Sequence, residues 1–134
     1  SNHCSIGPYA RIRPFTKISN NVKIGNFVEI KNSIIGKYCS INHLSYIGDS
    51  ILSNNINIGA GTITCNYDGK KKSTTIIESN VFVGSNCSLI APLIIKKNSK
   101  IGAGSVITKD IPPNSLALSR PKIKITNKIR KKIR

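Results

Sequence analysis

Aliphatic residues return at every sixth position along most of the chain. This spacing fits neither the 3.6-residue period of an α-helix nor the two-residue period of a single strand. It predicts a solenoid in which each six-residue repeat supplies a short strand and a turn. The phase slips by one residue twice and breaks once, between Cys65 and Ile76. The positions in phase are Ile6, Ile12, Ile18, Ile24, Ile30, Ile35, Ile41, Ile47, Leu52, Ile58, Thr64, Ile77, Val83, Leu89, Ile95, Ile101 and Ile107.

Three such repeats close one triangular coil with the aliphatic side chains inside it. We therefore expect an all-β fold, a left-handed parallel β-helix of about 5–6 coils. The position two residues before each aliphatic residue should also face inward, because strand side chains alternate. These positions hold mostly small residues, including Cys4, Cys39 and Cys87, which we interpret as reduced core residues. No C-x-x-C spacing occurs, which argues against a disulfide or zinc site, and nothing beside Cys65 indicates a nucleophile.

Glycine often follows the inward aliphatic residue. We expect it there because the turn demands backbone angles that other residues adopt at a cost. The glycines in this position are Gly7, Gly25, Gly36, Gly48, Gly59, Gly84 and Gly102.

Interruptions of the repeat divide the chain. The break predicts a protruding loop over residues 65–76, and the prolines in 110–114 should end the repeat because proline cannot donate to a strand ladder. We thus expect a β-helix over 1–114 and a C-terminal arm with a basic tail over 115–134. The chain begins in phase and without Met, so we expect it to be part of a longer protein.

Charge narrows the functional classes. The formal net charge is +16, with basic residues concentrated after Pro121 and in Lys70–Lys72. Nucleic-acid binding would also call for interleaved aromatic residues, but these make up only 5% of the chain. A solvated basic surface with phosphate contacts to small ligands is favoured, with no nucleic-acid partner. No apolar run approaches the roughly 18 residues that span a bilayer, so we expect a soluble, cytoplasmic protein without a membrane partner.

Candidate chemistry gathers at the break and at one histidine. The loop is rich in basic and hydrogen-bonding groups, which suits covering a ligand or reaching a neighbouring subunit; a plain surface hairpin with an Asp-Gly turn is the alternative. His43 follows the inward Ile41 by two residues and so lies beside a turn. An imidazole there suits general-base chemistry, and a surface histidine is the alternative. His3 is expected to be exposed to solvent.

Several longer strings together carry a specific resemblance. They are GPYARIRP (7–14), GNFVEIK (25–31), HLSYIGD (43–49), IGAGTITCNYDG (58–69), FVGSN (82–86), IGAGSVITKDIP (101–112) and ALSRP (117–121). Over roughly its first 121 residues the chain resembles the acetyltransferase domain of the bacterial bifunctional N-acetylglucosamine-1-phosphate uridyltransferase/glucosamine-1-phosphate acetyltransferase family.

This resemblance implies the substrates and the residues that bind them. The acceptor would be glucosamine 1-phosphate, the donor acetyl-CoA, and the product would feed UDP-N-acetylglucosamine synthesis for peptidoglycan and lipopolysaccharide. The residues matching contacts to the phosphate are Arg13, Lys31 and Lys72, and those matching contacts to the sugar are Tyr46 and Asn57. The residues matching contacts to acetyl-CoA are Ala60, Asn66, Tyr67, Ser85, Ala103 and Arg120.

The resemblance also implies the catalytic groups. His43 would deprotonate the amine, Glu29 is a weaker match for orienting the imidazole, and the backbone amide of Ala60 would stabilise the oxyanion. No metal is expected in this domain, because the magnesium of the family belongs to its uridyltransferase domain. No glycine-rich nucleotide loop of that domain is present, so uridyl transfer is expected only of a separate part of the parent protein.

Assembly and rival functions complete the expectations. A flat prism face, a protruding loop and a distal arm predict a C3 homotrimer with sites between subunits. One rival is a hexapeptide carbonic anhydrase, which needs three histidine ligands for zinc, whereas the chain has only two histidines. Others are a hexapeptide acetyltransferase acting on serine, galactosides or antibiotics, and a non-catalytic structural or nucleic-acid-binding solenoid. Only the expected activity requires three cations to converge on a phosphate.

Overall fold

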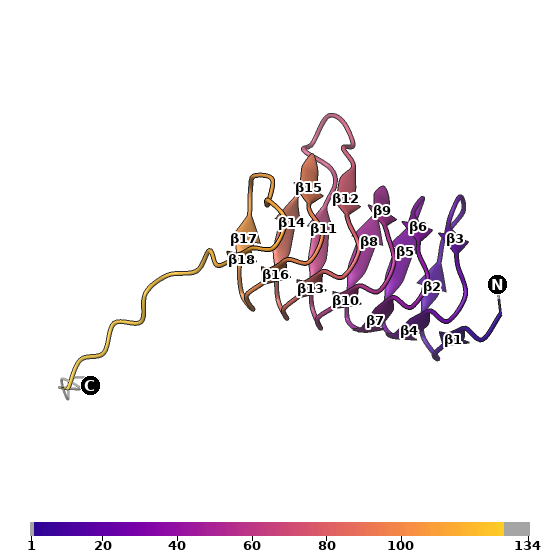
Figure 1. The fold of residues 1–134 in the computed structure, drawn as a ribbon, viewed down its shortest axis with the longest axis horizontal. Coiled ribbons are helices and arrows are strands. Elements are labelled where there is room, and N and C mark those ends of the chain that lie inside the picture. Colours follow the sequence, from indigo (N-terminus) through magenta and orange to yellow (C-terminus); the bar gives the residue numbers. More distant parts are fainter. Residues whose placement is uncertain (1, 128–134) are drawn as a thin grey trace, which may run out of the picture.

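The chain winds into a stack of triangular coils, as the six-residue period predicts (Figure 1). The computed structural model describes residues 2–127. Its strands form three parallel sheets, one on each face of a prism, so the expected parallel β-helix is confirmed. None of the described residues forms a helix long and apolar enough to cross a membrane.

Each sheet takes every third strand of the chain, except that the first sheet ends with β16 and β18. The first sheet contains β1 (Ser5–Ile6), β4 (Lys23–Asn26), β7 (Ser40–His43), β10 (Asn57–Ile58), β13 (Phe82–Val83), β16 (Lys100–Ile101) and β18 (Leu116–Ala117). The second contains β2 (Arg11–Ile12), β5 (Glu29–Lys31), β8 (Tyr46–Gly48), β11 (Ile63–Cys65), β14 (Ser88–Ile90) and β17 (Val106–Ile107). The third contains β3 (Lys17–Ile18), β6 (Ile34–Ile35), β9 (Ser50–Leu52), β12 (Thr75–Ile77) and β15 (Leu93–Ile95). We call the prism edges the 1–2, 2–3 and 3–1 edges, after the sheets that the chain joins there.

The predicted inward positions form the core. From Val22 to Ile107 the aliphatic residues in phase are buried, and Cys39 and Cys87 are buried among them as predicted. Ile6 is 50% exposed because it lies in the end coil, which is covered on one side only. All four cysteines are free. Burial raises the pKa of the half-buried Cys65 thiol, which disfavours the reactive thiolate.

The expected reason for the repeated glycines is wrong. The residues with positive φ lie later in each turn, and many are not glycine, such as Phe27 (57°) and Asn86 (54°). The glycines after the inward residues instead permit close packing between coils: a Cβ on Gly84 would lie 2.5 Å from the backbone nitrogen of Ala103. A Cβ on Gly25 would likewise collide with the backbone of Asn42.

Asparagine stabilises the left-handed turns of the 3–1 edge. Its short polar side chain tolerates positive φ, and here it also bonds to the coil above. Asn55, Asn80, Asn98 and Asn114 form a continuous ladder of side-chain hydrogen bonds of 2.8–3.2 Å.

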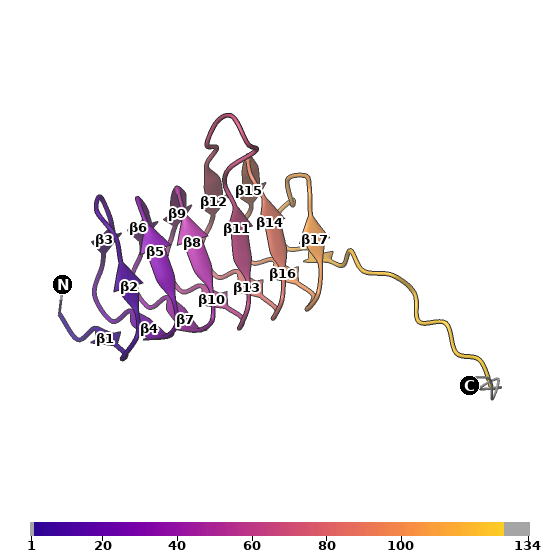
Figure 2. The same ribbon diagram turned by 180° about the vertical axis from the view of Figure 1, so that it is seen from behind.

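The break in the repeat is a small hairpin that projects from the prism (Figure 2). Tyr67 and Lys72 form an antiparallel bridge, and Asp68 Oδ1 accepts hydrogen bonds from the amides of Lys70 and Lys71 at 2.8 Å. The hairpin begins after β11 and returns the chain to β12, so it adds to the coil without displacing the strands around it.

The repeat ends later than expected. Pro112 and Pro113 lie in a turn and not in the ladder, so they do not stop it. Lys100 donates to Ser115 O at 2.8 Å and Gly102 donates to Ala117 O at 2.9 Å, which adds β18 to the first sheet. The boundary at residue 114 is therefore early by three residues. Residues 118–127 form the extended arm (Figure 1), and the rest of the basic tail, 128–134, lies outside the described residues.

Close packing at Gly84 should make it intolerant of a side chain. We expect Gly84→Ala to lower the free energy of unfolding by about 1–3 kcal/mol, because the added methyl group overpacks against the next coil. Chemical denaturation at fixed protein concentration measures the change. The matched control is Gly7→Ala, since a Cβ there would meet its nearest atom, a side-chain oxygen, only at 3.2 Å. Equal loss in both variants would contradict this explanation.

Candidate functional site

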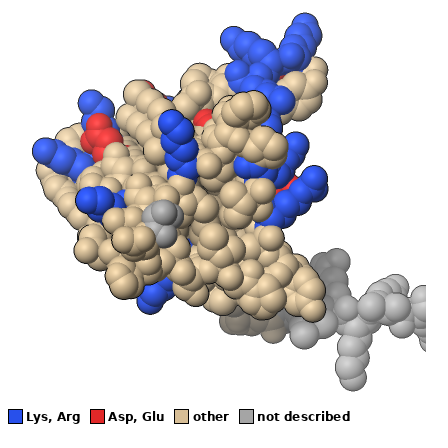
Figure 3. All heavy atoms as spheres, turned by 90° about the vertical axis from the view of Figure 1, so that its right-hand side faces the viewer, with Lys and Arg blue, Asp and Glu red and all other residues tan. Residues whose placement is uncertain are grey.

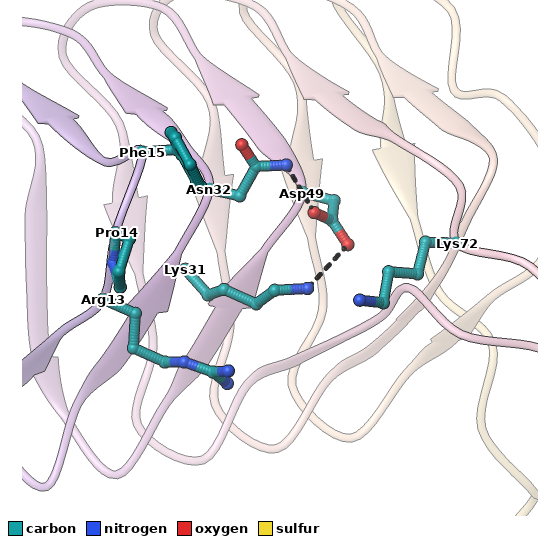
Figure 4. Close-up of a pocket in the computed structure, with 7 residues that line it drawn as sticks. All are labelled: Arg13, Pro14, Phe15, Lys31, Asn32, Asp49 and Lys72. Atoms are coloured by element: carbon teal, nitrogen blue, oxygen red, sulfur yellow. Dashed lines mark hydrogen bonds and ion pairs between the residues drawn. The ribbon is translucent and has the colours of Figure 1, made fainter.

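A cavity of about 370 Å³ opens at the 2–3 edge. Most of its polar lining is cationic (Figure 4). The lining residues are Arg13, Pro14, Phe15, Lys31, Asn32, Asp49 and Lys72.

The three cations reach the cavity from separate parts of the chain. Arg13 follows β2 and Lys31 ends β5, and both point outward because they alternate with inward isoleucines. Lys72 comes from the hairpin. Figure 4 shows the three side chains directed toward a common space. In Figure 3, Lys and Arg side chains also crowd the upper part of the molecule, with few carboxylates among them.

The cavity forms where the repeat slips. Both one-residue slips shorten turns of the 2–3 edge, and the residue with positive φ in each shortened turn is Asn32 (46°) or Asp49 (48°). The corresponding turn of the first coil has full length and carries Phe15. The slips thus place short polar side chains at the cavity floor, beside the aromatic ring that borders it.

A buried carboxylate organises the charges. Asp49 Oδ2 lies 3.5 Å from Lys31 Nζ, and the Asp49 side chain is 9% exposed. Burial alone would raise the pKa of Asp49, but hydrogen bonds from Asn32 and Asn66 and the charge of Lys31 together lower it. A hydrogen bond with Lys31, together with the positive charge of that residue, lowers the pKa of Lys72. The same bond raises the pKa of Lys31 despite desolvation, and the charge of Asp49 contributes in the same direction.

Tyr46 connects the cavity to the second sheet. Its phenol lies over Gly48, where any Cβ would collide with it, and Asn66 Nδ2 donates to its oxygen at 3.3 Å. Asn66 is buried and also donates to Asp49 Oδ2 at 2.6 Å. Tyr46 and Asn66 therefore join the cation cluster.

The 1–2 edge carries a second group of predicted residues. His43, Ala60, Ser85 and Ala103 occupy successive coils there, and Arg120 of the arm caps the column. The connecting hydrogen bonds run from Gly61 N to His43 O (3.2 Å), Asn86 N to Ala60 O (2.8 Å), Gly104 N to Ser85 O (2.8 Å) and Arg120 Nη1 to Ala103 O (2.9 Å).

Backbone donors are left over along this edge. The amides of Ala60, Ser85 and Ala103 donate no hydrogen bond within residues 2–127, although the glycines before them do. The His43 side chain is exposed and has no hydrogen-bond partner in the same part of the chain. The edge thus offers three peptide N–H groups and an imidazole to a ligand.

Three predicted residues lie outside both groups. Asn57 faces outward from the first sheet, in a separate cavity of about 290 Å³. Glu29 pairs with Arg11 at 3.4 Å, and no contact joins it to His43 in the described structure. Tyr67 is exposed on the hairpin. Within one chain, His43 and the cations lie toward opposite edges of the second sheet, with Tyr46 between them.

Sequence reasoning missed Asp49, Asn32 and Phe15 as cavity residues. The slips in phase before Ile35 and Leu52 were the available signal, because each shortens the turn that holds one of the two polar residues. Among residues 2–127, no cluster of three or more His, Cys, Asp or Glu side chains could hold a metal ion.

Two family models match the chain. The GMPPB C-terminal domain model covers residues 1–81, and the bacterial transferase hexapeptide model (six repeats) covers residues 74–109.

Close sequence relatives are bifunctional proteins. The chain is 59% identical over 116 residues to the bifunctional protein GlmU of Thermotoga maritima, a match that covers 87% of this chain and 26% of that protein. It is 60% identical over 120 residues to the GlmU of Nitrosospira multiformis, covering 90% of this chain and 26% of that one. The chain therefore spans about a quarter of the length of these relatives.

Solved structures share the fold. The H141N variant of perosamine N-acetyltransferase from Caulobacter crescentus, in complex with CoA and GDP-perosamine, superposes with a TM-score of 0.76 at 23% identity, over 91% of this chain and 58% of that one. The acetyltransferase domain of PglB from Neisseria gonorrhoeae gives 0.79 at 19% identity, over 88% and 55%. The GMPPB C-terminal domain model covers more than half of the chain, and the hexapeptide model and the solved structures agree with its stack of six-residue repeats; the chain therefore belongs to the family that the GMPPB C-terminal domain model describes.

Proposed function

We propose that this chain transfers the acetyl group of acetyl-CoA to the amino group of glucosamine 1-phosphate. The observation that carries the proposal is the convergence of Arg13, Lys31 and Lys72 on one cavity, next to Tyr46. The names of the GlmU relatives and of the sugar acetyltransferases with the same fold support it.

The cavity suits a sugar phosphate. Phosphate oxygens need charge-assisted donors; a guanidinium supplies two parallel N–H groups and an ammonium a concentrated charge. Tyr46 lies between the cations and His43 on the second sheet, where a sugar ring bound by its phosphate would extend. The glucosamine amine would then be directed toward the 1–2 edge.

His43 is the group best placed for the chemistry. In the proposed step the amine attacks the thioester carbonyl carbon while the imidazole of His43 takes a proton from the nitrogen. The negative charge on the carbonyl oxygen accepts a hydrogen bond from the unused amide of Ala60. The carbon–sulfur bond then breaks, CoA leaves as the thiol with a proton returned by His43, and the amide product forms. Glu29 as an orienting group for His43 remains a prediction.

Acetyl-CoA would lie along the 1–2 edge. The small residues there leave room for a thioester, and the unused amides of Ser85 and Ala103 continue the line toward Arg120. Asn66 and Tyr67 match the same ligand but lie at the 2–3 edge, so one chain alone divides the acetyl-CoA contacts between two edges.

This division supports a homotrimer in which neighbouring chains complete each site. The outer face of the third sheet supplies a suitable contact, because Ile34, Ile51, Ile76 and Ile94 stack in register across it. Ile34 is 46% and Ile51 41% exposed, which is unfavourable for a solvated surface. Asn57, on the first sheet, could reach a sugar only across such an interface.

The proposed product has an amide and an unblocked phosphate monoester, which suits a following uridyl transfer from UTP in the cytoplasm. We assign that reaction to a separate domain of the parent protein, as the bifunctional relatives suggest. The rivals, a related acetyltransferase for unphosphorylated acceptors or a non-catalytic solenoid, leave the convergence of three cations unexplained.

A thiol-release assay with acetyl-CoA tests the acceptor. We expect transfer to glucosamine 1-phosphate with a kcat/KM at least about tenfold above that for glucosamine, because a charge-assisted bond contributes roughly 1.5–3 kcal/mol. Lys31→Met should remove this preference, whereas Lys37→Met, at an exposed turn of the 3–1 edge, should keep it. Equal rates with both sugars in the native protein would point to a different acceptor. A native protein that transfers no acetyl group would point to a non-catalytic solenoid.

Removal of the base should abolish turnover without abolishing binding. We expect His43→Asn to lower kcat by roughly 10²–10⁴-fold, the usual contribution of a general base. The binding of glucosamine 1-phosphate, followed by calorimetry, should change little. His3→Asn is the matched control because His3 is an exposed histidine at the end of the stack. Full activity in His43→Asn would rule out this mechanism.

Sedimentation tests the assembly. We expect the native protein to sediment at three times the 14.6 kDa chain mass, and Ile51→Arg to sediment as an inactive monomer because a charge enters the apolar contact. Val106→Arg places the same charge on an exposed residue of the second sheet and should stay trimeric. An active native monomer is the contradicting result.

A further inference from the structure

Asp49 is a carboxylate in a cavity built of cations. It is the acidic residue among those lining the cavity, and it lies on the floor in a left-handed turn. The negative charge of Asp49 would repel a phosphate bound in this cavity, so charge alone excludes Asp49 as a direct ligand of the phosphate. The contacts of Asp49 indicate what it does instead.

Both carboxylate oxygens accept hydrogen bonds. Oδ1 accepts a hydrogen bond from Asn32 Nδ2 at 2.7 Å, and Oδ2 accepts one from Asn66 Nδ2 at 2.6 Å. Oδ2 also lies 3.5 Å from the ammonium of Lys31 (Figure 4). These contacts fix the end of the Lys31 side chain, which would otherwise have many rotamers.

The backbone and the side chain of Asp49 hold opposite ends of the hairpin. Its carbonyl accepts a hydrogen bond from Thr75 N at 3.3 Å, directly after the hairpin, while its side chain holds Asn66, directly before it. Ser73 N donates to Asn66 O at 2.8 Å and joins the two ends of the hairpin. Asp49 therefore ties both ends of the segment that carries Tyr67 and Lys72.

We propose that Asp49 is a positioning residue that sets Lys31 and the Lys72 hairpin at the spacing a phosphate requires, and links them through Asn66 to the acetyl-CoA contacts. This inference rests on the proposed function. The Lys31 ammonium has three N–H groups and Asp49 takes only one of them, so the same side chain can be positioned by Asp49 and still donate to the phosphate.

Asparagine cannot replace this carboxylate. It has the same shape but a single oxygen, so either Asn32 or Asn66 would face an amide N–H group in place of an acceptor. Asp49→Asn therefore removes the charge and one of the two hydrogen bonds from Asn32 and Asn66, and it leaves no cavity because the side chains have the same size. If Asp49 acted only by repulsion, this variant would bind phosphate more tightly; if it positions the cations, binding weakens.

Steady-state kinetics separate these outcomes. We expect Asp49→Asn to raise the KM for glucosamine 1-phosphate by about tenfold, the loss of roughly one charged hydrogen bond. The kcat/KM for unphosphorylated glucosamine should change less than about twofold. The rise should shrink in a Lys31→Met background, because Asp49 acts through Lys31. An unchanged or lower KM, or an equal loss with both sugars, would overturn the proposal.

Asp110→Asn is the matched control. Asp110 also accepts a hydrogen bond in a turn, from Ile94 N at 2.8 Å, but it is exposed and outside the cavity. The Asp110→Asn variant makes the same change of charge and should leave the KM for glucosamine 1-phosphate and the KM for glucosamine unaltered. Circular dichroism and sedimentation establish that each variant keeps the fold and assembly. If Asp49→Asn does not fold, Asn32→Ala removes the donor to Asp49 Oδ1, loosens the carboxylate and should raise the same KM.

Amide hydrogen exchange gives a readout that does not need activity. In Asp49→Asn the amide of Ser73, which donates to Asn66 O, should exchange faster, by about tenfold, because Asn66 loses its bond to the carboxylate. The amide of Thr75, which donates to the backbone carbonyl of residue 49, and the core amides of the coils should keep their rates. Unchanged exchange at Ser73 would refute the proposal. If the native protein transfers no acetyl group, the proposed function fails, and the exchange rates still decide whether Asp49 holds the hairpin.

Discussion

The hydrogen-bonded register between successive coils is the constraint on which the rest of the structure depends. Each inward aliphatic residue sits directly above its counterpart in the coil below, so every turn is stacked on an equivalent turn. Residues distant in sequence thereby form columns along the prism edges. The close contact at Gly84 shows how little room the register leaves, because an added methyl group would meet the next backbone. The His43 column and the cation cavity both exist only because this stacking holds.

The two edges that flank the second sheet differ in the kind of group they offer. The 1–2 edge has full-length turns with small residues and unused amide donors, which suit a long neutral chain. The 2–3 edge has two shortened turns, a hairpin and charged side chains, which suit a compact anion. Asp49 belongs to one of the shortened turns and links the hairpin to the sheet. One repeated backbone geometry thus yields two unlike binding surfaces through one-residue changes in turn length.

Sequence reasoning predicted the fold because the six-residue period records the inward positions directly. It grouped Arg13, Lys31 and Lys72, which line one cavity, only through a family resemblance, since nothing in the period brings the hairpin to the cavity. It failed for the glycines because the period does not reveal which turn residue takes positive φ. It placed the end of the repeat early because Pro112 and Pro113 occupy a turn, where proline costs no ladder bond. Asp49 was missed because its role lies in side-chain contacts with residues 17 positions away.

The column on the 1–2 edge also has a fixed length. Neighbouring strands of a sheet are about 4.8 Å apart, so the three steps from His43 to Ala103 span roughly 14 Å. A donor lying along the edge must carry its reactive carbonyl and its anionic end at least that far apart to meet both the imidazole and the guanidinium of Arg120. The coil spacing, which no side chain can alter, would then act as a molecular ruler that selects donors by reach as well as by chemistry.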